Sequence, residues 1–190
     1  MTGKPVLAFV VFVATACTPV RVAPGASLDR EELAIYTVVI DSVLETRGDP
    51  FVVMAESTKV VGVSAEELTR WKLPRDSTAF GAAFGDLVAR NRMPVRVPER
   101  TLSGREIRTF GRAFDVQRDR DESRDFVLRS FEPVRWIHIV SRPGIDPERG
   151  RAVIFAGSSC GGWCGFLRLI LLTRTPRGWQ VLRADTVMQS

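Results

Sequence analysis

Apolar residues recur at three- and four-residue spacing near the start of the chain and predict an amphipathic helix there. The repeat runs over residues 33–44 and leaves one apolar stripe on an otherwise polar segment. Asp29 is followed three residues later by Glu32, which is the capping-box pattern of a helix N-terminus. Gly-Asp-Pro at residues 48–50 is typical of a helix end. The pattern therefore predicts a helix that begins after Asp29 and ends before residue 48.

The next part of the chain gives weaker patterns. Residues 51–54 are apolar and predict a strand, with a further extended stretch at residues 58–63. A second helix is expected at about residues 78–90, although Gly81 and Gly85 weaken it by roughly 1 kcal/mol each. Two glycines four residues apart would also let another backbone approach this helix closely.

A second capping-box pattern occurs near the middle of the chain. Ser103 and Glu106 are three residues apart and precede the apolar residues Ile107 and Phe110. This arrangement predicts a short third helix.

The C-terminal part of the chain has a different pattern. Four strand-like runs are separated by glycine-containing segments without helical periodicity. They lie at residues 134–141, 151–156, 166–174 and 179–187. Short connections favour hairpins and an antiparallel sheet. The sequence thus predicts an α+β domain in which N-terminal helices pack on a C-terminal antiparallel β-meander.

The first residues of the chain have the pattern of an export signal. Lys4 precedes an apolar run at residues 6–13, and the small residues 14–16 lead into Cys17. This order is typical of a secretory signal peptide. The apolar run is too short to cross a hydrocarbon core of about 30 Å as a helix. We therefore expect an exported protein without a spanning segment in this region.

Two export routes fit the residues around Cys17: lipidation of this cysteine and simple signal-peptide cleavage. Residues 13–17 resemble a bacterial lipobox, in which the cysteine is lipidated and becomes the mature N-terminus, although Ala14 stands where leucine is usual. Simple cleavage after Ala16 also fits the small residues. The lipoprotein interpretation divides the chain into a signal peptide (1–16), a lipid-anchored cysteine with a flexible tether (17–27) and one α+β domain (28–190). It predicts a location in the cell envelope, held at the periplasmic face of a membrane in a Gram-negative cell.

Composition narrows the class of partner. The hydrophobic content of 45% and charged content of 26% are those of a globular protein. The net charge is +5, but the basic residues are scattered among acidic ones and form no stripe with aromatic residues between them. A nucleic-acid partner is therefore not expected.

One loop holds the remaining two cysteines. Cys160 and Cys164 are separated by a segment that would span about 13 Å if extended, whereas disulfide-bonded Cα atoms lie about 5.5 Å apart. The glycine pair at 161–162 lets the chain double back, and an exported compartment favours a disulfide. The small ring would contribute about 2 kcal/mol and fix the pose of Trp163, the possible recognition residue.

Two other interpretations of this loop remain open. The first is a redox-active pair, but three residues separate Cys160 from Cys164, and the following segment predicts a strand, not the helix of a thioredoxin-like site. The second is metal binding with His138, which is the single histidine of the chain. No serine lies in a Gly-x-Ser-x-Gly elbow. We therefore predict no catalytic residue, no metal site and no cofactor.

The C-terminal part resembles a family of bacterial secreted proteins and lipoproteins of unknown function. The resemblance rests on Ser-Arg-Pro-Gly at residues 141–144, Cys-Gly-Gly-Trp-Cys-Gly at residues 160–165 and Arg-Gly-Trp at residues 177–179. It supplies no activity. The order of helices and strands also resembles the cone-shaped α+β folds of the nuclear-transport-factor type.

The expected function follows from the predicted location and the cysteine loop. We expect a cell-envelope lipoprotein that is a non-enzymatic binding or interaction module for an unknown protein or small ligand. The alternative is a thiol-disulfide redox protein using Cys160 and Cys164.

Overall fold

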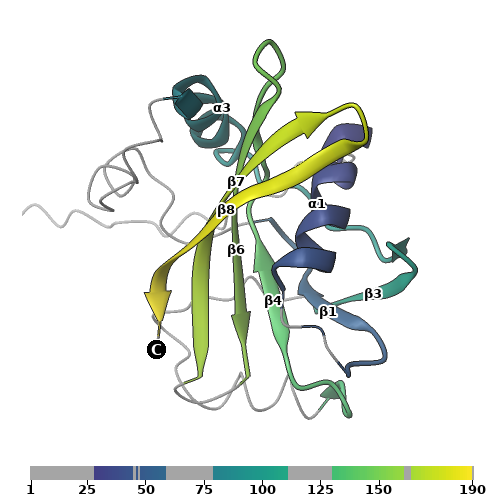
Figure 1. The fold of residues 1–190 in the computed structure, drawn as a ribbon. Coiled ribbons are helices and arrows are strands. Elements are labelled where there is room, and N and C mark those ends of the chain that lie inside the picture. The colour runs from purple at the N-terminus through teal and green to yellow at the C-terminus, as the bar shows by residue number, and fades with distance from the viewer. Residues whose placement is uncertain are drawn as a thin grey trace, which may run out of the picture.

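The computed structural model describes residues 28–44, 46, 48–58, 79–110, 130–160 and 164–189. Within these residues, two helices and one eight-stranded sheet form an α+β fold (Figure 1). The helices are α1 (Arg30–Ser42) and α3 (Gly81–Arg90). The strands are β1 (Val52–Ala55), β2 (Thr101–Leu102), β3 (Arg105–Phe110), β4 (Ile137–Val140), β5 (Gly144–Asp146), β6 (Arg151–Ser159), β7 (Gly165–Thr175) and β8 (Gly178–Gln189). No helix in this part of the chain is long and apolar enough to cross a membrane.

The sheet is mixed. Its strand order is β2-β3-β1-β4-β6-β7-β8, and β5 pairs with β6 outside this path. The strands β6, β7 and β8 form the predicted antiparallel meander. In contrast, β1 lies parallel to both β3 and β4. The prediction of an antiparallel C-terminal meander is therefore confirmed, and the sheet as a whole is mixed because β1 inserts between β3 and β4.

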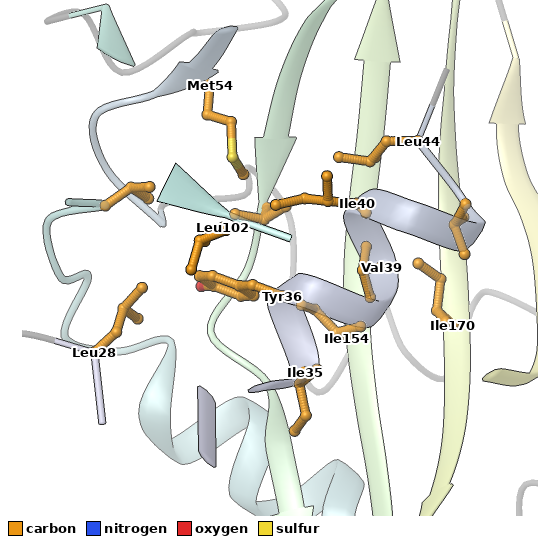
Figure 2. Packing of buried hydrophobic residues seen from close by; sticks show 14 of the residues in the cluster. Leu28, Ile35, Tyr36, Val39, Ile40, Leu44, Met54, Leu102, Ile154 and Ile170 are labelled. Atoms are coloured by element: carbon orange, nitrogen blue, oxygen red, sulfur yellow. The ribbon is translucent and has the colours of Figure 1, made fainter. Parts of the chain in front are cut away.

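The two helices cover opposite faces of the sheet. Successive residues of a strand point to opposite faces, so Ile154 packs in the cluster around α1 and Phe155 in the cluster around α3. Figure 2 shows Ile35, Val39 and Ile40 of α1 in this packing beside Ile154 and Ile170. Since β6 and β7 lie between both helices, they are apolar on both faces.

Helix α1 begins as predicted and ends earlier. The side chain of Asp29 accepts hydrogen bonds from the amides of Glu31 and Glu32, and the Glu32 carboxylate accepts one from the Asp29 amide (2.9 Å). This confirms the capping box. The helix ends at Ser42, because the chain then turns towards the sheet, where Arg168 Nη1 donates to the Val43 carbonyl (2.8 Å). Guanidinium groups satisfy carbonyls well at helix C-termini.

The predicted third helix is wrong. Residues 103–106 instead form the turn of the β2–β3 hairpin and the start of β3. Ser103 and Gly104 have positive φ angles of 52° and 74°, which suit a two-residue hairpin turn. The buried residues Ile107 and Phe110 of β3 lie on different faces, in the clusters with α1 and with Phe51 respectively. The capping-box pattern was misleading because serine followed by glycine also satisfies the turn.

The glycine that allows close backbone approach is not one of the two in α3. Gly81 and Gly85 have open space where a Cβ would lie. A Cβ on Gly144 would instead lie 2.0 Å from the Ala83 carbonyl oxygen and 2.3 Å from the Leu87 amide nitrogen. Strand β5 therefore packs directly on the backbone of α3, and only glycine fits there.

Candidate functional site

The tip of the β6–β7 hairpin brings the two loop cysteines together. The strands pair in regular register up to Ser159 and Gly165. The Cα atoms of Cys160 and Cys164 are 5.4 Å apart, and the pair forms a disulfide. The Cys160 amide donates to the Cys164 carbonyl (3.1 Å), and Ser159 Oγ donates to the same carbonyl (3.3 Å). The tip is thus closed by both a covalent bond and hydrogen bonds. This arrangement is the one predicted for the cysteine pair.

Two predicted site residues lie outside the described part of the chain. These are Cys17, the predicted lipidation site, and Trp163, the possible recognition residue. The signal peptide and tether (1–27) and the extended stretch predicted to continue to residue 63 lie mainly or entirely outside it too. For these segments the sequence-based expectations stay predictions.

The single histidine points into the core. His138 lies opposite Ser158 in the β4–β6 pairing and is 1% exposed. A hydrogen bond joins His138 Nδ1 and Ser158 Oγ (2.8 Å). Burial lowers the pKa of His138 to about 3, so the imidazole is neutral at pH 7. The residues described include no group of three or more His, Cys, Asp or Glu side chains that could hold a metal ion. His138 is therefore a satisfied core residue with no access to solvent.

An aromatic cluster lies next to the disulfide and was missed by the sequence-based prediction. The rings of Trp136 and Phe166 have centroids 6.0 Å apart, and the Arg168 guanidinium lies 4.0 Å from the centre of the Phe166 ring. We call Trp136, Phe166 and Arg168 the tip aromatic cluster. Phe166 follows Gly165 and faces Ser158 across the hairpin. Trp136 is half-buried, whereas Trp179 is a buried core residue. The signal in the sequence was Phe166, two residues after Cys164.

A buried polar cluster joins the two helices just beyond the C-terminal end of β4. Glu32 of α1 is fully buried, and its Oε1 lies 2.8 Å from Arg142 Nε and 3.4 Å from Arg90 Nη1. Asn91 binds the backbone of Arg142 twice, accepting from its amide and donating to its carbonyl, both at 2.8 Å. We call Glu32, Arg90, Asn91 and Arg142 the interlayer cluster. It connects α1 and α3, which lie on opposite faces of the sheet.

The residues beside Arg142 have packing roles as well. The Tyr36 hydroxyl donates to the Ser141 carbonyl (3.0 Å), and Ser141 Oγ accepts from the Phe155 amide (3.0 Å). Burial, together with the negative charge of Glu32, raises the pKa of Tyr36 well above its ordinary value, so the hydroxyl remains a donor. The Ser-Arg-Pro-Gly sequence at 141–144 is thus explained by hydrogen bonding, the ion pair and the contact of Gly144 with α3. These contacts account for it without a catalytic role.

A surface pocket of about 450 Å³ lies along the β2–β3 edge. Its lining residues are Glu99, Arg100, Thr101, Glu106, Ile107, Arg108 and Phe131. Arg108 Nε lies 2.9 Å from Glu106 Oε1, and its guanidinium lies 3.7 Å from the centre of the Phe51 ring. Hydrogen bonds from the backbone and side chain of Thr109 lower the pKa of Glu99. Because these charged groups are paired with protein groups, the pocket indicates no class of ligand.

The disulfide-closed tip with its aromatic cluster is therefore the best candidate site in the described residues. It offers a hairpin end closed by a disulfide and half-buried aromatic surface, and among its described residues there is no exposed nucleophile with a base beside it. Its interpretation depends on this geometry, because no family model, no curated protein and no solved structure matches the chain.

Proposed function

We propose that this protein is a cell-envelope lipoprotein whose domain is a non-enzymatic binding module. The disulfide-closed tip of the β6–β7 hairpin would be its recognition feature. The observation that carries the proposal is the Cys160–Cys164 pair, with its Cα atoms 5.4 Å apart at the end of the hairpin. Disulfides persist in oxidising compartments. The pair therefore agrees with an export signal at residues 1–16 and lipidation at Cys17.

The geometry of the tip favours binding. A loop closed by a disulfide has fewer conformations than an open one, which lowers the conformational entropy lost on binding. Trp163 lies within this ring by sequence, and tryptophan is enriched among the residues that dominate binding energies. Trp136 and Phe166 extend the apolar surface beside the ring. A protein partner or small ligand would contact Trp163 and the tip aromatic cluster.

The redox alternative lacks the usual support for a reactive thiolate. Reactive cysteines commonly have a thiol pKa lowered by a helix N-terminus or a neighbouring cation. Cys164 leads directly into strand β7, which begins at Gly165. His138 is buried and neutral, and it bonds to Ser158. These features argue for a structural disulfide.

A cone-shaped fold of the nuclear-transport-factor type is part of the same proposal. Its support is a chain that starts with a helix and ends with a long antiparallel meander, with α1 packed on one face of the sheet. Fold alone does not assign function.

The binding role is tested by comparing capture of envelope components by three immobilised proteins. These are the unaltered chain, Trp163→Ala and the control Met93→Ala, which removes an exposed apolar side chain (63% exposed) just after α3. We expect the control to retain the captured partners and Trp163→Ala to lose them while its thermal unfolding is unchanged. Equal capture by Trp163→Ala and the unaltered chain would contradict the recognition role.

The anchor is tested separately. Cells fed radiolabelled palmitate should label the unaltered chain but not Cys17→Ser, and the variant should leave the membrane fraction. Absence of label on the unaltered chain, with an N-terminus at residue 17, would instead support simple cleavage after Ala16.

A further inference from the structure

Strand β8 lies at one end of the sheet. In the strand order it follows β7, its one hydrogen-bonded neighbour in the described part of the chain. It is 12 residues long and runs to the end of the described chain, where Figure 1 marks the C-terminus. A long edge strand presents backbone donors and acceptors that can pair with another strand.

Exposed apolar side chains gather on the same strand. Leu182 is 56% exposed and Met188 is 51% exposed, and the other large apolar residue exposed to this extent in the described residues is Met93. Exposed apolar residues on an edge strand mark a site for association with another polypeptide.

The sequence of β8 is complementary to itself. Arg183 and Asp185 flank Ala184, and their side chains pair within the strand, with Arg183 Nε 2.8 Å from Asp185 Oδ1. An antiparallel copy of this segment, turned about Ala184, would thus place opposite charges face to face.

We infer that two copies of this chain associate through β8, paired antiparallel about a two-fold axis at Ala184. Arg183 then faces Asp185 of the partner subunit, and Asp185 faces the partner subunit's Arg183. Cross-strand pairs of opposite charge stabilise antiparallel sheets, and like charges in these positions oppose pairing. Because the interface uses the same strand of both copies, the assembly closes as a dimer.

The irregularities of β8 agree with this register. The β7–β8 pairing shifts between Leu171 and Leu172 and again between Leu167 and Arg168. Between these shifts, residues 183–186 pair regularly with residues 171–168. Bulges at edges end strand pairing. The regular segment around Ala184 is therefore the part of the edge that pairs with a second copy, and the exposed side chains of Leu182 and Met188 lie at either end of it.

Charge reversal tests the pairing in solution. By sedimentation, the unaltered chain should dimerise, whereas Arg183→Asp and Asp185→Arg, each alone, should weaken dimerisation about tenfold or more, since both contacts become repulsive. Mixing the two variants should restore a dimer, because each charge again meets its opposite. Both variants lose the pair within the strand, so a general loss of stability cannot produce this restoration. A monomeric unaltered chain, or a mixture no more dimeric than its components, would overturn the inference.

A cross-link tests the axis. Paired residues in antiparallel strands have Cα atoms about 4.5–5.5 Å apart, within disulfide range. In a Cys17→Ser background, Ala184→Cys should therefore form a covalent dimer on mild oxidation. In the control Gln180→Cys, the cysteines of the two copies would lie eight residues apart along the paired strands, or about 26 Å, and should not cross-link. No cross-link at Ala184→Cys, or equal cross-linking by both variants, would exclude this register.

Discussion

Replacing Glu32 tests how the two helices are held on opposite faces of the sheet. Its carboxylate is fully buried and pairs with Arg142 and Arg90, and it also accepts the Asp29 amide of the capping box. Removing one member of a buried ion pair costs about 3–5 kcal/mol, because the opposite charge loses its compensation. The side chains of Arg142 and Arg90 remain 16% and 28% exposed, so water relieves part of this cost. We therefore expect Glu32→Gln, which keeps an acceptor for the cap, to lower the free energy of unfolding by about 3 kcal/mol.

Urea denaturation measures this loss. A domain of this size has a total stability of about 5–15 kcal/mol, so 3 kcal/mol is a large fraction of it. With an m value of about 2 kcal/mol/M, the midpoint should fall by about 1.5 M in urea. The control is Arg96→Ala, which removes an exposed ion pair with Glu56 and should shift the midpoint by less than about 0.5 M.

The double variant Glu32→Gln/Arg142→Met sharpens the test. Since both residues belong to one interaction, the combined loss should be smaller than the sum of the single losses. A midpoint for Glu32→Gln as little changed as that of Arg96→Ala would refute the reasoning that the interlayer cluster holds the helices together.

Three further predictions concern pH, packing and the disulfide. The pKa of His138 is about 3 in the fold and about 6.5 when unfolded, so the unfolded chain binds one more proton between these values and stability falls as the pH drops. From pH 7 to pH 5 the free energy of unfolding, measured by urea denaturation, should therefore fall by about 2 kcal/mol. His138→Asn should show a smaller decrease over the same range. An equal decrease in both proteins would contradict the burial argument. Gly144→Ala should destabilise the domain by about 1–3 kcal/mol or more in the same assay, whereas Gly85→Ala, with open space around it, should stabilise α3 by up to about 1 kcal/mol. In redox buffers with thiol trapping, the Cys160–Cys164 pair should resist reduction until below about −300 mV, while a potential between about −120 and −230 mV would favour the redox alternative.

Local patterns in the sequence determined several elements of the fold. The capping box at Asp29 and Glu32, the apolar stripe of α1 and the strand-like runs of the meander were predictable, because each depends on hydrogen bonds and spacing within a few residues. The disulfide was predictable for the same reason, since Cys160 and Cys164 are four residues apart and two glycines lie between them.

Tertiary structure decided what local patterns left open. Glu32 and Arg142 are 110 residues apart in sequence, and nothing near either residue indicates their ion pair. Residues 103–106 fit a helix cap and a hairpin turn equally well, and pairing of β3 with β1 selects the turn. Likewise, the burial of the His138 side chain in the core and the partial burial of Trp136 depend on which strands become neighbours. A sequence encodes the hydrogen bonds that a segment makes with itself, whereas the partner of a buried charge or a close-packed glycine is fixed only when distant segments meet in the folded sheet.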